Sequence, residues 1–397
     1  MATVKLVDIC AKIGSGATPR GGKEAYCDKG ISLVRSQNVL DFAFSCDGLA
    51  YINDEQAKKL DNVEVFADDV LLNITGDSVA RACMMDPSYL PARVNQHVAI
   101  VRGLKNRVVS SYILYYLQWK KQHLLQLASA GATRNALTKG MIEQLEINLP
   151  SIDEQKKIVT VLDSLQNRIQ LNQKVNDNLY AQARVITNQW IAENDSDYEL
   201  LPLSEVAAIN PDTYSPKEEW KYVNYLDTSS ITDGCIAEIQ RISPSTEKLP
   251  SRARRKIVSN DVVFSTVRPN QRHFGIISEP LPNMLASTGF AVIRSKNPLV
   301  CNELIYLCLT DNAFIEKMQQ LAEQSTSTFP SIKPSDLGVC EIPCPKDDSS
   351  SSLTETLKAM FALIAANHRE NASLAELRDS LLPRLMIGEI DVSDIDI

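Results

Sequence analysis

The sequence lacks the features that define several large classes of protein. None of its 397 residues falls in an apolar run approaching the ~20 residues that a membrane-spanning helix needs. The N-terminus has no long apolar segment, so we expect no secretory signal peptide. The nine cysteines are an odd number without a Cys-x-x-Cys pair, which is typical of reduced thiols rather than of a disulfide framework. We therefore expect a cytoplasmic protein that does not contact a membrane.

The common nucleotide and metal motifs are also missing. No Walker A segment is present, which excludes a P-loop ATPase on motif grounds. Residues 210–214 come nearest to the motif with which an adenine methyltransferase holds its base, but they lack the second proline and an adjacent aromatic. We interpret them as a turn. Cys340 and Cys344 are the closest cysteine pair, and no histidine follows them at zinc spacing. We expect no metal site and no catalytic site in this chain.

The net charge of −8 argues against simple binding to nucleic acid. However, the acidic residues are unevenly distributed. Residues 1–150 carry 17 Lys and Arg against 15 Asp and Glu, whereas residues 346–397 carry 5 against 10. Nucleic-acid binding needs a local basic surface rather than a basic total. We expect the chain alone to bind DNA weakly and to need a more basic partner.

The chain repeats itself. Four short segments of the first half recur in the same order in the second half, at offsets between 192 and 197 residues. The matched pairs are residues 5–9 with 202–206, 69–73 with 261–265, 98–102 with 290–294, and 147–150 with 342–345. Internal repetition of this kind predicts two copies of one structural domain.

Each half also has the same sequence of local patterns. Short β-branched runs bounded by Gly, Asn, Asp and Pro predict strands, and helical patterns follow them before a proline. The predicted strands are residues 70–75, 97–102, 262–267 and 289–294, and the helical patterns are residues 110–128 and 302–321. After Pro150 and Pro345 the pattern changes to that of a long helix. We expect domains at 1–150 and 196–345, helices at 151–195 and 346–390, and an acidic tail at 391–397.

The two long helices have matching heptad seams. Spacings of four and three residues alternate along each helix, and every position in one seam lies 195 residues from its counterpart. This pattern predicts a coiled coil. The alternative is two amphipathic helices that pack separately on their own domains. The central seam positions are Leu162, Leu165, Ile169, Asn172, Asn176 and Leu179 in the first helix, and Leu357, Met360, Ile364, Asn367, Asn371 and Leu374 in the second.

Both seams contain a pair of asparagines at the same place, which favours mutual pairing of the helices. A buried asparagine is destabilising unless it bonds to another polar group, so it selects the register. If the helices run antiparallel, Asn172 faces Asn371 and Asn176 faces Asn367. A helix of ~38 residues is ~57 Å long at ~1.5 Å per residue, which exceeds one turn of DNA at roughly 34 Å.

At this point the sequence resembles a known family. Residues 14–19, followed by 31–36, resemble the opening of a target-recognition domain in type I restriction–modification specificity subunits. Residues 149–158 resemble the family's link from domain to helix, and residues 377–390 resemble its C-terminal signature. The resemblance covers essentially the whole chain. One departure is the second link, residues 346–352, which lacks the Glu-Gln pair of the first and has a run of serines instead.

The resemblance implies a fold, a function and partners. The fold is α+β, with two tandem mixed α/β target-recognition domains separated by two long helices that form an antiparallel coiled coil. Each domain of such a protein reads one half of a bipartite site in double-stranded DNA. Two modification subunits dock on the helices and methylate adenine with S-adenosylmethionine, and restriction subunits add ATP- and Mg²⁺-dependent translocation and cleavage. None of that chemistry belongs to this chain, which is expected to bind no cofactor.

Polar loops that leave predicted strands are the candidates for DNA contact. Arg favours guanine and Asn or Gln favours adenine, whereas Lys, Arg and small hydroxyls suit phosphates. The first loop of each half contributes Thr75, Asp77, Ser78 and Arg81, and Arg268, Asn270, Gln271 and Arg272. A second loop contributes Thr133, Arg134 and Asn135, and Thr326 and Thr328. The alternative for each loop is a solvated connection without a binding role.

Other basic residues are candidates for phosphate contact. Arg252, Arg254, Arg255 and Lys256 form the densest basic run, for which a solvated surface turn is the alternative. Arg20 and Arg35 are weaker candidates in the first half.

Two other functions remain open at this stage. The chain could be a stand-alone specificity-like protein with a regulatory or anti-restriction role that self-associates through its helices, and copurification with a methyltransferase would separate the two cases. A nuclease or methyltransferase in its own right would be active as the isolated chain. The sequence gives neither the target bases nor the length of the spacer between half-sites.

Overall fold

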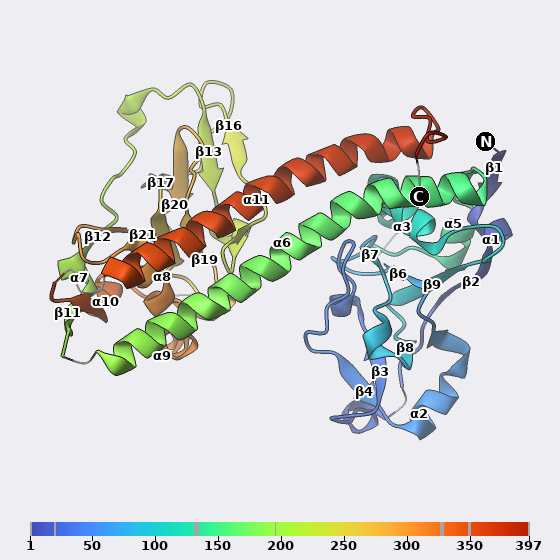
Figure 1. Cartoon of the computed structure of the whole chain (residues 1–397), viewed down its shortest axis with the longest axis horizontal. Helices are drawn as coiled ribbons and strands as arrows, with labels where there is room; N and C mark the ends of the chain where they lie inside the picture. Colours follow the sequence, from blue (N-terminus) through green and yellow to red (C-terminus); the bar gives the residue numbers. More distant parts are fainter. Residues whose placement is uncertain are drawn as a thin grey trace. The chain divides into compact units, whose positions relative to one another are not determined.

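Figure 1 presents the computed structural model, which describes residues 2–19, 21–130, 135–194, 196–325, 329–347 and 351–395. The contacts divide the chain into two compact units. Unit 1 comprises Met1–Gln170 and Asn371–Ile397, and unit 2 comprises Leu171–Glu370. Each of the two long helices therefore contributes one half to each unit. In the described part of the chain, no helix has both the length and the apolar character needed to cross a membrane.

The strands of unit 1 form a small sheet and two four-stranded sheets in its described residues. In the small sheet, β1 (Ala2–Lys5) pairs antiparallel with β10 (Glu146–Leu149). One larger sheet has the order β2-β9-β6-β7, with β2 (Cys10–Ser15), β9 (Val98–Gly103), β6 (Val70–Asn73) and β7 (Ala82–Met84). The other has the order β4-β3-β8-β5, with β4 (Ala50–Ile52), β3 (Ile31–Val34), β8 (Ala92–Val94) and β5 (Glu64–Val65). In that sheet β3 and β8 are parallel.

Unit 2 has the same topology. Its small sheet pairs β11 (Tyr198–Pro202) with β22 (Glu341–Pro345). The larger sheets have the orders β12-β21-β18-β19 and β16-β13-β20-β17, and β13 and β20 are the parallel pair. Their strands are β12 (Ala207–Ile209), β21 (Phe290–Ser295), β18 (Asp261–Ser265), β19 (Phe274–Ile277), β16 (Gln240–Ile242), β13 (Val223–Leu226), β20 (Met284–Ser287) and β17 (Ala253–Lys256). A hairpin of β14 (Ile231–Thr232) and β15 (Cys235–Ile236) is added. The predicted repeat is confirmed, and the four predicted strands are β6, β9, β18 and β21.

Four of the five shorter helices of unit 1 also recur in the described residues of unit 2. Unit 1 contains α1 (Leu6–Ile9), α2 (Asp54–Lys59), α3 (Ser110–Trp119), α4 (Lys121–Ser129) and α5 (Lys139–Glu143), and unit 2 contains α7 (Leu203–Val206), α8 (Asn302–Leu309), α9 (Asn312–Glu323) and α10 (Pro334–Gly338). The two helical patterns predicted from the sequence are each divided into two helices. In unit 2 the division falls at Asp311, whose side chain accepts a hydrogen bond from Ala313 N and so starts α9.

One buried ion pair occurs in both units at an offset of 192 residues. The Asp69 carboxylate accepts from Arg102 Nε at 2.6 Å and from Phe66 N at 2.7 Å. The Asp261 carboxylate accepts from Arg294 Nε and from Val258 N, both at 2.8 Å. Both aspartates are fully buried, and a buried carboxylate must be paired and hydrogen-bonded. This ion pair explains why the repeated segment 69–73 and 261–265 begins with aspartate. It also explains why the segment 98–102 and 290–294 ends with arginine.

The first long helix, α6 (Ile152–Glu193), starts at a defined set of contacts. Ser151 N donates to Glu154 Oε2 at 2.8 Å and Glu154 N donates to Ser151 Oγ at 3.3 Å, which is a capping box. The buried Gln155 side chain accepts from Val109 N and donates to the carbonyls of Arg107 and Pro150. The Glu-Gln pair of the first link therefore fixes the helix to its domain. The second link lacks this pair, and the described part of the second long helix, α11, is Ser351–Met386.

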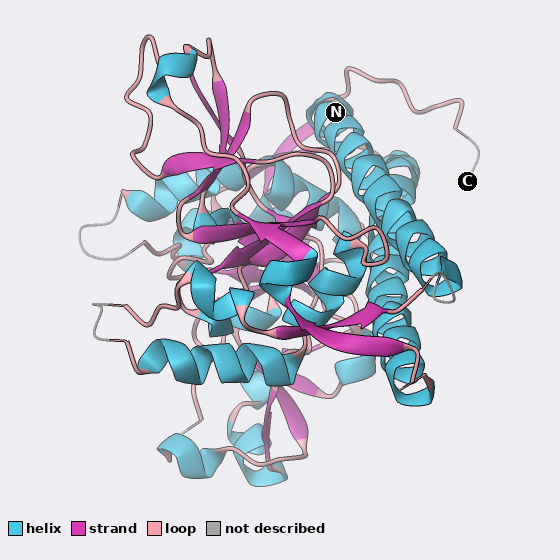
Figure 2. Cartoon of the chain, turned by 90° about the vertical axis from the view of Figure 1, so that its left-hand side faces the viewer, coloured by secondary structure: helices cyan, strands magenta, loops and turns pink. Residues whose placement is uncertain are grey.

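The two long helices pair antiparallel within each unit (Figures 1 and 2). In unit 1, Ile158 and Leu162 of α6 share one core with Leu382 and Leu385 of α11. In unit 2, Ala183 of α6 shares a core with Leu353, Leu357 and Phe361 of α11. Residues with higher numbers in α6 pack against residues with lower numbers in α11. The two helices are therefore antiparallel. The alternative of two helices packed separately is excluded.

The predicted seam is confirmed at its polar centre in unit 2. Asn367 Nδ2 donates to Asn176 Oδ1 at 2.7 Å, and both side chains are buried. Asn172 donates to the Glu370 carboxylate at 2.8 Å. The predicted contact of Asn172 with Asn371 joins the two units and stays a prediction. Of the apolar seam residues, Leu162, Ile169, Leu357 and Ile364 are buried, and Leu165, Leu179, Met360 and Leu374 are half-buried.

Candidate nucleic-acid interface

Backbone–backbone hydrogen bonds fix the conformation of the loop after β6. Val79 N donates to Gly76 O at 3.1 Å, and Ala80 N donates to Asn73 O at 2.8 Å. Gly76 (φ 77°) and Ala80 (φ 68°) have left-handed backbone conformations, which L residues adopt rarely. These bonds turn the chain sharply out of the sheet and back into β7.

The loop after β18 shares this backbone frame in part, shifted by 192 residues. Arg272 N donates to Pro269 O at 3.0 Å, whereas Ala80 N donates to Asn73 O. Gln271 N donates to Arg268 O at 2.9 Å, as Val79 N donates to Gly76 O. Arg268 (φ 49°) and Arg272 (φ 58°) are left-handed at the positions of Gly76 and Ala80. The structure therefore aligns Arg81 with His273 and Ala80 with Arg272. The two loops share a frame and differ in their side chains.

In each unit the second predicted loop lies beside the first. Gly76 N donates to Asn135 O at 3.3 Å, and a β-bridge joins Thr75 to Ala136. In unit 2, Arg268 N donates to Pro330 O at 2.9 Å, and a β-bridge joins Val267 to Ser331. The predicted contacts Arg20, Thr133, Arg134, Thr326 and Thr328 lie outside the described residues.

In unit 1 the loops border a hollow of about 770 Å³. Its lining includes five predicted residues together with three that were not predicted. These are Thr75, Asp77, Ser78, Arg81 and Asn135, and Ser36, Gln37 and His97. The Thr75 hydroxyl lies 2.6 Å from His97 Nδ1, and Asp77 is exposed. The hollow thus presents donors and acceptors of several kinds, which is the chemistry that reading of base edges requires.

In unit 2 the four predicted loop residues have different surroundings. The Arg268 guanidinium lies over the Phe329 ring, 4.7 Å from the centroid. Asn270 and Gln271 are exposed. Arg272 Nε donates to Asp233 Oδ1 at 2.6 Å, and Arg272 Nη1 donates to Asn312 Oδ1 at 3.0 Å. The Arg272 side chain is therefore bound within unit 2 by an ion pair, whereas the half-buried Arg268 contacts the Phe329 ring.

The basic run, residues 252–256, lies largely within the edge strand β17. Arg254 Nε donates to Ser251 O at 3.2 Å, and Lys256 Nζ lies 2.6 Å from Glu218 Oε2. Arg255 Nε is buried and has no hydrogen-bond partner among the described residues, and burial lowers the pKa of its guanidinium. Arg252 is exposed. The backbone connects Arg252 to the loop after β18, because Thr288 N donates to Arg252 O and Thr266 N donates to Gly289 O, each at 2.8 Å.

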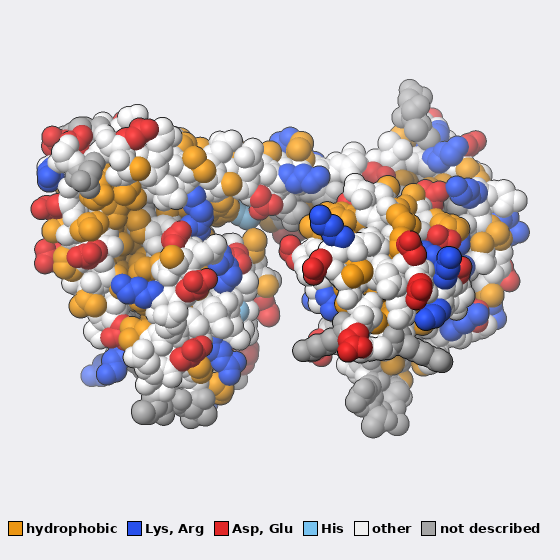
Figure 3. Space-filling model, turned by 90° about the horizontal axis from the view of Figure 1, so that it is seen from below, with side chains coloured by type: hydrophobic (Ala, Val, Ile, Leu, Met, Phe, Trp, Pro, Cys, Tyr) orange, Lys and Arg blue, Asp and Glu red, His pale blue; other side chains and the backbone are white. Residues whose placement is uncertain are grey.

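Arg35 is not among the described residues that line the unit 1 hollow. Its Nη2 donates to Gly48 O, and its Nε is buried without a partner among the described residues. The next residue, Ser36, begins a 3-10 helix (Ser36–Asn38) and lines the hollow. Figure 3 shows Lys and Arg side chains interspersed with Asp and Glu on the face in view, not gathered in one stripe.

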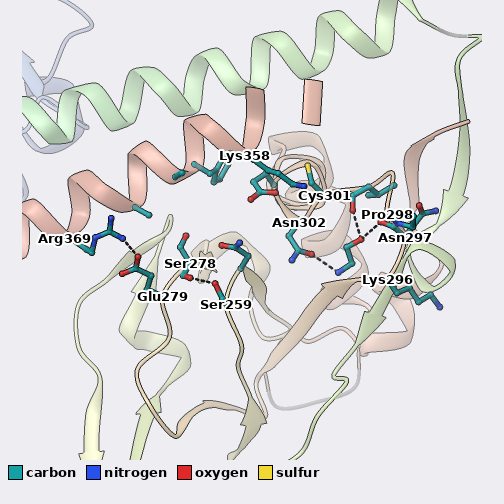
Figure 4. Close-up of a pocket in the computed structure, with 17 residues that line it drawn as sticks. Ser259, Ser278, Glu279, Lys296, Asn297, Pro298, Cys301, Asn302, Lys358 and Arg369 are labelled. Carbon is teal, nitrogen blue, oxygen red and sulfur yellow. Dashed lines mark hydrogen bonds and ion pairs between the residues drawn. The ribbon is translucent and has the colours of Figure 1, made fainter. Parts of the chain in front are cut away.

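A second hollow, of about 830 Å³, lies in unit 2 between α11 and the turns near β18, β19 and β21 (Figure 4). Arg369 of α11 forms an ion pair with Glu279 there, and Ser259 Oγ donates to Ser278 O at 2.6 Å. Lys358 extends from α11 towards Cys301 in the same view. The predicted DNA-contacting residues of unit 2 do not belong to its described lining, so this hollow is separate from the loop tips.

Comparison with known proteins shows which proteins the chain resembles. Residues 1–181 match the family model described as the type I restriction modification DNA specificity domain. The chain is 21% identical over 416 residues to the putative type I restriction enzyme MjaX specificity subunit of Methanocaldococcus jannaschii, covering 98% of this chain and 93% of that protein. The MjaIX specificity subunit of the same organism is 22% identical over 417 residues, covering 99% and 94%. The chain is therefore similar to type I specificity subunits along nearly its whole length.

A solved structure has the same fold as this chain. The type I restriction-modification system S subunit from M. genitalium superposes with a TM-score of 0.54 at 15% sequence identity, covering 97% of this chain and 96% of that one. At this identity the likeness shows the fold alone. It agrees with the repeated topology and the paired long helices described above.

The structure also shows what the sequence interpretation missed. Ser36, Gln37 and His97 line the unit 1 hollow beside the predicted loop. The repeat contained a signal for Ser36, because Thr228 lies 192 residues later and likewise begins a 3-10 helix (Thr228–Ser230) after a buried strand. No comparable signal existed for His97, because its counterpart is Gly289.

Proposed function

We propose that this chain reads a bipartite site in double-stranded DNA, one half-site per unit, and directs modification and restriction subunits to that site. One observation carries the proposal: a partly shared loop frame occurs twice, after β6 and after β18, with different side chains on it. A shared frame gives the two units the same way of approaching DNA. Different side chains give them different target bases.

The names of the related proteins support this role. The MjaX and MjaIX proteins are called type I restriction enzyme specificity subunits, and this chain matches them along nearly their whole length. The family model matched by residues 1–181 is described as a DNA specificity domain. The loop residues at the tips have the chemistry that base reading needs.

The proposal assigns no catalytic step to this chain. Two modification subunits would dock on α6 and α11 and hold the S-adenosylmethionine, and restriction subunits would hold ATP and Mg²⁺. The paired helices would act as the spacer between the half-sites. At 42 residues and ~1.5 Å per residue, α6 is about 63 Å long, longer than one DNA turn of roughly 34 Å.

The proposal is tested by expressing the chain with the modification subunit of its host in a strain without other methyltransferases and sequencing the methylome. We expect adenine methylation at one bipartite motif that disappears when this chain is omitted. The alternative of a stand-alone regulatory protein predicts no new motif and a chain that elutes as a self-associated species without the modification subunit. Methylation that persists without the chain refutes the proposal.

A further inference from the structure

We infer that Arg268, held by Phe329, reads a guanine in the half-site of unit 2, and that Arg272 only supports the loop. The inference rests on the proposed function and adds to it the identity of one reading residue and the base it reads. It separates two arginines that lie four residues apart and that the sequence does not distinguish.

Backbone hydrogen bonds fix Arg268 on both sides within its loop, where its side chain is half-buried. Its N–H donates to Pro330 O and its carbonyl accepts from Gln271 N, both at 2.9 Å. Its φ of 49° is left-handed, a conformation that non-glycine residues adopt rarely and that often marks functional positions. The equivalent residue in unit 1 is Gly76, so the frame itself needs no side chain there. Arg268 therefore adds a guanidinium at a position where unit 1 has only backbone.

Phe329 restricts the orientation of that guanidinium. The ring comes from the neighbouring loop and is 54% exposed, and the Arg268 guanidinium lies 4.7 Å from its centroid. Stacking on an aromatic face orients the plane of an arginine and leaves its N–H edge free to donate. No carboxylate of the described residues forms an ion pair with Arg268. The oriented, unpaired N–H groups match the O6 and N7 acceptors of guanine, which arginine contacts in a bidentate manner.

Arg272 has the opposite character. Its guanidinium is bound to Asp233 and Asn312, and its counterpart in unit 1 is Ala80, which is fully buried. The side chain at this position therefore turns into the unit rather than away from it. A base could be contacted only if the ion pair with Asp233 opened.

The test measures base discrimination by the complex of this chain with its modification subunit. Methylation rates are compared on the natural site and on a site whose guanine in the unit 2 half is changed to adenine. Arg268→Lys keeps the charge but removes the bidentate fork, and we expect it to lower the discrimination ratio roughly 10- to 100-fold, the size of one good bidentate contact. Phe329→Leu should lower the same ratio, and Phe329→Tyr should restore it. Arg272→Lys is the matched control and should leave the ratio unchanged.

Three results would overturn the inference. An Arg268→Lys complex that discriminates like the wild type would make Arg268 a phosphate contact. An Arg272→Lys complex with the same loss as Arg268→Lys would remove the distinction between the two arginines. A unit 2 half-site without guanine would exclude the assigned base. A wild-type complex without any sequence-specific methylation would instead refute the proposed function.

Discussion

Replacing Asn367 with alanine should destabilise the helix pair of unit 2 by about 2 kcal/mol. The substitution removes the donor of the 2.7 Å bond to Asn176 Oδ1 and leaves the Asn176 amide buried without that partner. Asn176 is only 3% exposed and Asn367 only 8%, so water cannot replace the lost bond at either side chain. Leaving a buried polar group unpaired costs roughly 1–3 kcal/mol. Asn176→Ala should have a similar effect, because it removes the hydrogen-bond acceptor of the Asn367 amide.

Replacing both asparagines with alanine gives the coupling free energy between the two side chains. If the two amides bond mainly to each other, the second substitution should add little, and the coupling free energy should be about 1–2 kcal/mol. Replacing both by leucine should be close to neutral or stabilising, because a buried polar pair can be exchanged for apolar packing. Native-state hydrogen exchange at the amides of α6 beyond Leu171 measures these free energies. Asn167→Ala, at an exposed position of the same helix, corrects for helix propensity. Single effects that add within about 0.3 kcal/mol would refute the reasoning.

Three further predictions concern the units and their links. Asp69→Ala and Asp261→Ala should each destabilise their own unit by about 3 kcal/mol, because each leaves an arginine without its buried partner; hydrogen exchange in β6 and β9, or in β18 and β21, should change in that unit alone. Gln155→Ala should destabilise the start of α6 by roughly 1–3 kcal/mol and speed exchange in its first turns, whereas the exposed Lys156→Ala should not. The Lys256 and Ser215 bonds hold the pKa of Glu218 below its usual 4.5, so the stability they contribute is present above that pH and is lost as the pH falls through the lowered value. The melting temperature of Glu218→Gln should therefore fall less than that of the wild type between pH 6 and pH 3, and parallel curves would contradict this.

The elements with local or repeated patterns were predictable from the sequence. The strands β6, β9, β18 and β21 are continuous apolar runs that recur at one offset, and the heptad spacing of α6 and α11 placed Asn176 opposite Asn367. The parallel pair β3 and β8 was not predictable, because these short strands lie far apart in the chain and no local periodicity connects them. The division at Asp311 depends on one capping side chain inside a longer apolar pattern.

The positions of the loops in the candidate site were predictable from the sequence. The contacts of their side chains were not. The repeat located both loops, and the structure shows that they share part of one frame. The sequence grouped Arg268, Asn270, Gln271 and Arg272 as one cluster, whereas the ion pair that binds Arg272 comes from Asp233, 39 residues earlier. Gln37 and His97 reach the unit 1 hollow through tertiary packing alone. Contacts of this kind depend on the folded arrangement of sheets, which single-sequence patterns do not determine.

The central claim is that two similar units read two separate half-sites. Methylome sequencing of two variant complexes tests it most directly, one changed in unit 1 at Asp77 and Ser78 to alanine and the other in unit 2 at Arg268 to lysine. We predict that each variant relaxes or changes the bases of one half of the motif, a different half in each case, while the other half stays as in the wild type. Variants that both act on the same half, or that each disturb both halves, would contradict the account.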